Sequence, residues 1–129
     1  MFNRVIFVGN LTRDPELRYS PQGTAVATLG LAVNSRVKQG DEYKDETLFI
    51  DIIVFGKQAE NVTQYLSKGR GVIVEGRLRE RRWEYEGQRR SKFEVIASTV
   101  RFLPRREVAA AGEIEDVLPP EENTDLEPF

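Results

Sequence analysis

Residues 56–78, GKQAENVTQYLSKGRGVIVEGRL, decide the fold that the sequence predicts. The first half spaces its apolar side chains as one face of a helix does, at Ala59, Val62, Tyr65 and Leu66. The following Ser-Lys-Gly at 67–69 is a typical helix stop signal. Residues 72–78 are rich in Val, Ile and Leu and predict a strand. Gly76 inside that strand indicates a β-bulge or the sharp bend of a small barrel.

The segments on either side of this stretch predict four further strands. They are residues 5–8, 25–33 and 48–55 before the helix and 93–103 after it, with turn signals at 14–15, 20–23 and 85–88. The polar residues 34–46 are expected to form a loop. Residues 5–8 are apolar throughout, so both faces of that strand are expected to be buried. The order of elements is that of an all-β, five-stranded OB-fold barrel with one helix between strands 3 and 4.

Charge divides the chain into two parts. Residues 4–106 hold all 19 Lys and Arg against 13 Asp and Glu, a net charge of +6, while residues 107–129 hold the other 8 acids. A basic body favours a nucleic-acid partner, and an acidic tail favours interaction with proteins. The tail is rich in Ala, Glu and Pro, without a periodicity that could bury a core. The sequence therefore predicts one folded domain over 1–104 and a disordered acidic tail over 105–129.

The composition argues against catalysis. The chain has no Cys and no His, which excludes disulfides, Cys/His zinc sites and His-based catalytic triads. No apolar run approaches the roughly 18 residues of a membrane span. We expect a cytoplasmic, nucleoid-associated binding protein without cofactor or metal. The enzymatic alternative is a carboxylate-dependent metal nuclease, and its candidate ligands are Asp41, Glu42, Asp45, Glu46 and Asp51.

Candidate binding residues continue along the strand that begins at residue 72. They share one parity, and so one face of an extended chain: Arg77, Arg79, Arg81, Trp83 and Tyr85. Arginines contact phosphates, and the flat rings of Trp and Tyr suit the exposed bases of a single strand. The alternative is that Trp83 packs against the barrel and the arginines are merely solvated.

Other candidate residues lie on the earlier strands and at the end of the chain. Phe49 and Phe55 share a parity, although a Phe on a strand is usually a core residue. Arg4 and Arg18 would extend the basic surface. The sequence ends in an apolar residue preceded by acids, which suits docking into a pocket with a basic rim, through Asp125, Leu126, Glu127, Pro128 and Phe129.

Six blocks of sequence occur in the order typical of one known family. They are NRVIFVGNL (3–11), DPELRY (14–19), GTAVA (23–27), VFGK (54–57), YLSKG (65–69) and VEGRLR (74–79). Over roughly residues 2–103, and again at the final Pro-Phe, the chain resembles the bacterial single-stranded DNA-binding proteins. An RNA-directed or primosome-type OB module stays open as an alternative, since stacking and charge alone do not separate RNA from DNA.

The resemblance implies a homotetramer of OB-folds that binds and wraps single-stranded DNA without sequence preference. It implies stacking by Phe49, Phe55 and Trp83, and phosphate contacts by Arg4, Arg18 and Arg79. It also implies that the acidic tip recruits replication, repair and recombination proteins. The chain departs from the family pattern at Val37, where many relatives carry a stacking Trp, and at Asp51, where many carry a basic residue. Its tail also departs from the usual pattern, reading Asp-Leu-Glu-Pro-Phe after a short linker.

Overall fold

A computed structural model describes residues 1–104 of the chain. The predicted disordered tail, and the candidate docking residues at its end, lie outside the described residues. In chain order the elements are β1 (Val5–Leu11), β2 (Glu16–Tyr19), β3 (Ala25–Gln39), β4 (Glu42–Phe55), α1 (Lys57–Tyr65), β5 (Gly71–Tyr85) and β6 (Gln88–Phe102). The helix α1 is too short and too polar to cross a membrane.

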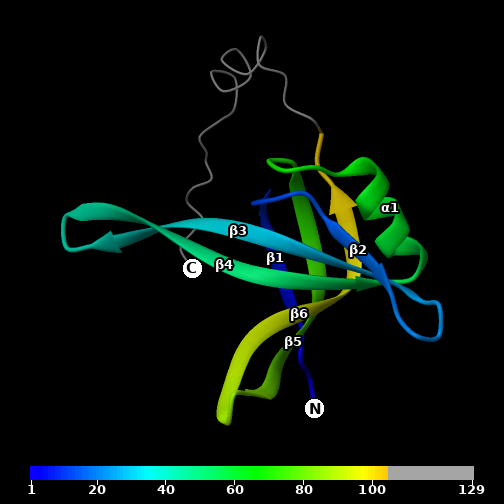
Figure 1. Ribbon diagram of the computed structural model, residues 1–129. Coiled ribbons are helices and arrows are strands. Elements are labelled where there is room, and N and C mark those ends of the chain that lie inside the picture. Colours follow the sequence, from blue (N-terminus) through cyan, green and yellow to red (C-terminus); the bar gives the residue numbers. More distant parts are fainter. Residues whose placement is uncertain (105–129) are drawn as a thin grey trace.

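The strands of this region close into a barrel. Their order in the sheet is β1-β5-β6-β4-β3-β2, and an additional pairing of β1 with β3 joins the two ends of the sheet. Five strands form the closed barrel, with α1 between β4 and β5, so the predicted OB-fold is confirmed. The short edge strand β2 was not predicted, because its four residues lie between two turn signals. Figure 1 shows α1 at one side of the barrel.

Alternating side chains of the barrel strands fill its interior. The fully buried set comes from four strands and the helix: Ala27, Leu29, Leu31, Ile52, Val54, Ala59, Val62, Val72, Val74 and Val95. The register between β5 and β6 shifts between Glu75 and Gly76, which confirms the predicted bulge. A Cβ on Gly76 would overlap the backbone of Ile96 and Ala97, so only glycine allows the two strands to approach there.

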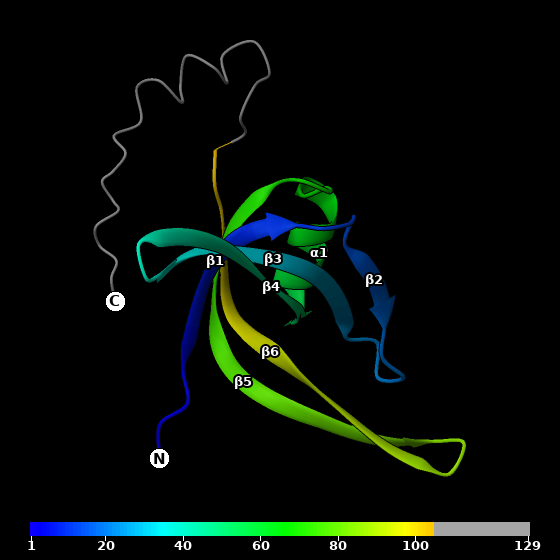
Figure 2. The same cartoon turned by 90° about the vertical axis from the view of Figure 1, so that its left-hand side faces the viewer.

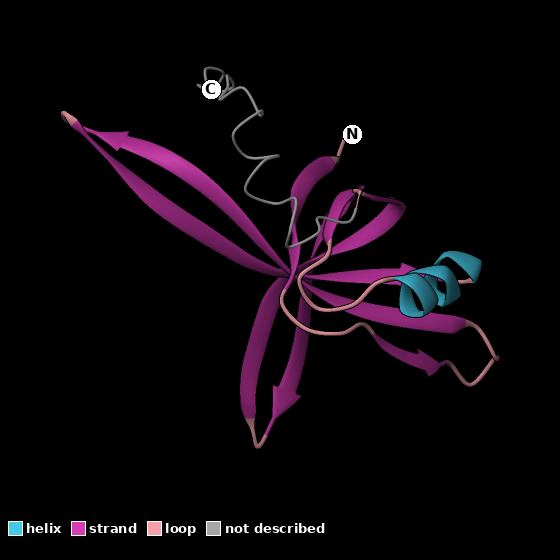
Figure 3. Cartoon of the chain, turned by 90° about the horizontal axis from the view of Figure 1, so that it is seen from above, coloured by secondary structure: helices cyan, strands magenta, loops and turns pink. Residues whose placement is uncertain are grey.

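Two long hairpins project from the barrel, and one of them corrects a sequence prediction. Residues 34–46 were expected to form a loop, but β3 and β4 stay paired from Asn34–Thr47 out to Gln39–Glu42. Polar residues are compatible with a strand when both of its faces lie in solvent. We call this hairpin, residues 34–47, the β3–β4 arm, and residues 79–94 the β5–β6 arm. Figure 3 shows the two arms leaving the barrel in different directions.

The first strand buries only one of its two apolar faces in the single chain. Both faces of residues 5–8 were expected to be buried, but in the single chain Ile6 and Val8 are 60% and 53% exposed. Val5 and Phe7 pack against the core instead. The reason is geometric, because a strand of a small barrel has only one face toward the interior. Two large aliphatic side chains therefore remain exposed on the side of β1 that points away from the barrel interior.

Candidate nucleic-acid interface

The outward side of β4 carries two aromatic rings. Ile50, Ile52 and Val54 point into the barrel, so the residues of opposite parity point outward. These include Phe49, which is 70% exposed, and Phe55. The expectation for an isolated Phe, that it belongs to the core, is therefore wrong for both. Their rings lie where a ligand could reach them.

Strand register continues this surface from β4 across β6 to β5. Asp51 is opposite Glu94 in β6, and Glu94 is opposite Arg79 in β5, so the three share one face. Pairing of β5 with β6 is regular from Arg77 to the end of the hairpin. The five candidates of shared parity therefore lie on this outer face, namely Arg77, Arg79, Arg81, Trp83 and Tyr85. We call the surface that they form with Phe49 and Phe55 the outer face; Figure 2 shows the β5–β6 arm that carries its distal part.

The remaining two predicted arginines lie at the margins of this surface. Arg18 of β2 is opposite Val26, and Val26 is opposite Phe55, so Arg18 shares the outer face with that ring. Arg4 precedes β1 and forms an ion pair with Glu75. The neighbouring Asn3 amide exchanges two hydrogen bonds with the backbone of Leu78, which ties this end of the chain to β5. A groove beside the bulge includes both Arg4 and Arg77.

Two of the arginines are held by a buried carboxylate. Glu94 is only 2% exposed and forms ion pairs with Arg79 and, at 3.6 Å, with Arg81. The Arg79 Nε also donates a hydrogen bond of 3.2 Å to the Glu94 carboxylate. The idea that these arginines are merely solvated is therefore wrong. Within residues 1–104, Arg77 and Arg18 form no ion pair.

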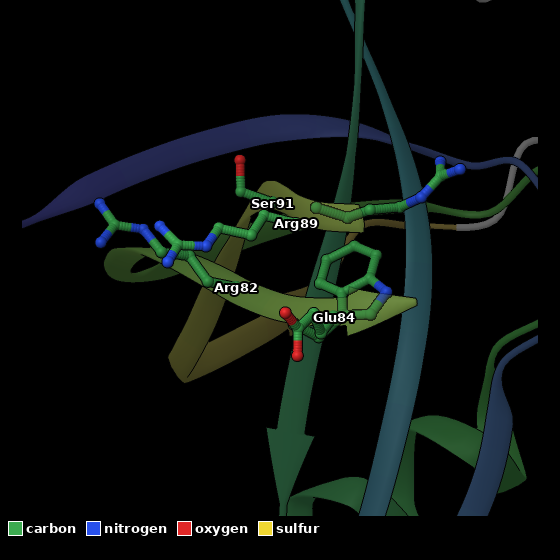
Figure 4. Close-up of a pocket in the computed structure, with 6 residues that line it drawn as sticks. Arg82, Glu84, Arg89 and Ser91 are labelled. Carbon is green, nitrogen blue, oxygen red and sulfur yellow. The ribbon is translucent and has the colours of Figure 1, made fainter. Parts of the chain in front are cut away.

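Trp83 lies on the β5–β6 arm and is not part of the core cluster. The Arg81 guanidinium lies 4.9 Å from the centre of its ring, and Arg90 lies 5.8 Å from that of Tyr85. A groove of about 600 Å³ runs beside Trp83. Figure 4 shows the Arg82 and Arg89 side chains of this groove extending to the same side, away from Glu84.

The other face of the arm holds an exposed ion pair. The Arg82 guanidinium donates a 2.7 Å hydrogen bond to the Glu80 carboxylate. This hydrogen bond lowers the pKa of Glu80 and raises that of Arg82. Both groups therefore stay charged at neutral pH, and Arg82 keeps a partner close by. Arg82 has the opposite parity to Trp83 and does not belong to the outer face.

A second groove, also of about 600 Å³, lies beside Phe49. Arg13 crosses the backbone of Gly30 there, and its guanidinium lies 3.6 Å from the Asp51 carboxylate. Lys92 reaches the same carboxylate from β6. The groove thus places an exposed ring next to a charged cluster, which suits a base with its attached phosphate.

Sequence reasoning missed two residues of this surface. Arg13 lies in the loop after β1, and nothing in the sequence indicated that it folds over β3. Tyr43 lies in the segment that was predicted as a loop. It has the same parity on β4 as Phe49, and the Arg36 guanidinium lies 5.6 Å from the centre of its ring. No signal in the sequence indicated it, because residues 34–46 show no hydrophobic alternation.

The carboxylates proposed for a metal nuclease do not form a site. Glu42 and Glu46 lie on one face of the β3–β4 arm and Asp45 on the other, and Asp51 is engaged by Arg13 and Lys92. Residues 1–104 contain no group of three or more acidic side chains placed to hold a metal ion. In the part of the chain that the structure describes, this surface offers aromatic rings and cations.

Fold and surface together define an OB-fold protein whose outer face carries both aromatic rings and basic side chains. Residues 2–103 match the model of the single-strand binding protein family. The chain belongs to that family, which is one of binding proteins.

Known proteins of similar sequence carry the same family description. The chain is 50% identical over 101 residues to a single-stranded DNA-binding protein of Treponema pallidum, covering 78% of this chain and 57% of that one. It is 43% identical over 132 aligned positions to one of Thermotoga maritima, covering 99% and 93% of the two chains. The chain thus spans little more than half the length of the first relative.

A solved structure has the same fold. The Plasmodium falciparum SSB, in complex with ssDNA, superimposes with a TM-score of 0.75 at 29% identity, over 81% of this chain and 96% of that one. A deletion mutant of the Thermus aquaticus single-stranded DNA binding protein gives a TM-score of 0.74 at 33% identity, over 81% and 52% of the two chains.

Proposed function

We propose that this protein binds and protects single-stranded DNA without sequence preference, through the outer face. The observation that carries the proposal is the placement of Phe49, Phe55 and Trp83 on one surface with Arg77 and Arg79. Rings stack on any base, and arginines contact phosphates that every nucleotide carries. Duplex DNA hides its base faces, so this surface favours a single strand. The named relatives and the DNA-bound Plasmodium structure support the choice.

Titration of the chain with oligo-dT tests this function directly. Trp83 is the only tryptophan, so its fluorescence reports on the β5–β6 arm. We expect strong quenching with oligo-dT, little change with a duplex of equal length, and weaker binding of oligo-U at the same salt concentration. Equal affinity for oligo-U would favour the RNA-directed alternative. The absence of binding to any single strand would remove the proposal.

We further propose that the protein acts in replication, repair and recombination in the cytoplasm, at the nucleoid. Its acidic tail, residues 107–129, would then recruit partner proteins through Asp125–Phe129. The support is the division of charge between body and tail and the final Pro-Phe. A tethered acidic segment experiences a high effective concentration of its own basic body, so it would also compete with DNA for that body.

Removal of residues 107–129 is expected to increase the affinity for oligo-dT, most strongly at low salt. The deletion takes away 8 negative charges that compete for the basic body, and salt screens that competition. Fluorescence titrations with oligo-dT at low and at high salt would measure the gain in affinity and its decrease as salt rises. An unchanged affinity at low salt would contradict the competition.

Deletion of Phe129 alone separates the two roles of the tail. It removes no acidic side chain, so DNA binding should barely change, while capture of the partner proteins should be lost. The partners are those that the full chain retains from a lysate and that mass spectrometry identifies. Retention of the same proteins by the shortened chain would rule out docking through this residue.

We also propose that the protein assembles as a homotetramer through its OB domains. The exposed Ile6 and Val8 on β1 support an interface, because two large aliphatic side chains side by side on a strand are costly to leave in water. The number four comes from the family resemblance. Assembly would also bring several outer faces together, which suits wrapping of a long strand.

A further inference from the structure

Two carboxylates lie at the centre of the outer face, and each holds two basic side chains. Asp51 of β4 and Glu94 of β6 are directly opposite each other in the register. We call them the acid pair. Asp51 contacts Arg13 and Lys92, and Glu94 contacts Arg79 and Arg81.

The backbone is shaped to allow these contacts. A side chain on Gly30 would overlap the Arg13 guanidinium and the Thr12 hydroxyl, so glycine lets Arg13 cross β3 toward Asp51. On the other side, Arg81 of β5 is opposite Lys92 of β6, and Arg79 of β5 is opposite Glu94 of β6. These two cross-strand pairs are neighbours on the same face of the sheet. The cluster is therefore built by the sheet register and not by chance encounters of long surface side chains.

The acid pair cancels half of the cluster's charge. Four cations and two carboxylates leave a net charge of +2 where the basic side chains alone would give +4. Glu94 is 2% exposed, so neither water nor small cations can readily replace its arginines. The Asp51 side chain is 25% exposed at the edge of the groove beside Phe49, where a phosphate would compete with it for Arg13 and Lys92.

We propose that Asp51 and Glu94 are positioning residues that set how strongly the outer face engages phosphates. They hold the four cations along a defined strip, and they reduce the number of phosphates that the strip can neutralise. A larger share of the affinity then comes from stacking on the rings, and binding becomes less sensitive to salt. This inference rests on the proposed binding of single-stranded DNA.

The Asp51→Asn variant tests the inference, because asparagine keeps the shape of the side chain and removes one negative charge. One more cation becomes available to phosphate, so the plot of log affinity against log salt should steepen by about 0.7. The ratio of the variant's affinity for oligo-dT to that of the parent chain should thus be about 2.6-fold larger at 50 mM than at 200 mM salt. Fluorescence anisotropy of labelled oligo-dT measures both values.

Two further variants make the result specific. Glu60→Gln removes the same charge from the exposed surface of α1, and its salt slope should equal that of the parent chain. In the double variant Asp51→Asn/Lys92→Gln the local charge is restored, so the slope should return to the parent value. A double variant that keeps the steep slope would show that the local charge balance at Asp51 does not set the number of phosphate contacts, and would overturn the inference.

The remaining outcomes are also decisive. If Asp51→Asn has the slope of Glu60→Gln, the acid pair does not limit phosphate contacts and the inference is wrong. A lowered thermal midpoint with an unchanged slope would give Asp51 a structural role only and would overturn it as well. Failure of the parent chain to bind oligo-dT would refute the proposed function itself, and that result is visible before any variant is compared.

Discussion

Replacement of Trp83 by alanine is expected to weaken oligo-dT binding by about 1–3 kcal/mol, which is roughly 5- to 150-fold. The ring lies on the outer face, outside the core cluster, and the Arg81 guanidinium lies 4.9 Å from its centre. A base that stacks on the ring would therefore have a cation within reach of its phosphate. Loss of the ring removes the stacking surface and leaves Arg81 without its aromatic neighbour.

Anisotropy of labelled oligo-dT is the appropriate measurement, since this variant has no tryptophan left. Trp83→Phe should retain much of the affinity, because phenylalanine still offers a flat ring. Tyr65→Ala is a matched control, as it removes an exposed aromatic side chain that lies on α1, beside Phe102. If Trp83→Ala bound oligo-dT with unchanged affinity and had a normal thermal midpoint, Trp83 would not be a stacking residue.

A glutamate in place of Val8 is expected to abolish assembly. Val8 is 53% exposed in the single chain, so the barrel itself should tolerate the change. Burial of an unpaired carboxylate in an apolar interface costs several kcal/mol per subunit. Light scattering at micromolar concentration should give four times the 14.8 kDa chain mass for the parent and a smaller oligomer or monomer for the variant.

Gln64→Glu controls for the charge, because it places one carboxylate on the exposed surface of α1. Its mass should equal that of the parent chain. Circular dichroism and thermal unfolding would check that Val8→Glu keeps the barrel. A monomeric parent chain would refute the homotetramer outright, and an assembled Val8→Glu variant would place the interface away from β1.

Local sequence patterns were sufficient to predict the barrel strands and the helix. The run of Ile and Val in 48–55 favours a strand, and the helical spacing after Gly56 follows from local geometry, so a linear pattern records both directly. Gly76 predicted the bulge in a similar way, because a glycine inside a strand can be read directly from the sequence. The shared parity of Arg77 and Trp83 also needed nothing beyond an extended chain.

The β3–β4 arm could not be inferred in this way, and the sequence did not show which face of β1 the barrel covers. Residues 34–46 are polar on both faces because both faces lie in water, and such a strand has no hydrophobic alternation to detect. For residues 5–8 the sequence shows that both faces are apolar, but the single barrel covers only one of them.

The sequence by itself determined an OB-fold barrel, a division into basic body and acidic tail, and a row of arginines and rings on one strand. Only the tertiary structure decided which of those arginines are engaged by acids. Asp51 and Glu94 meet because β4 and β6 pair in parallel, far apart in the chain. Arg13 joins them because Gly30 leaves its path open. Pairing between distant strands depends on closure of the whole barrel, and no local pattern of residues records it.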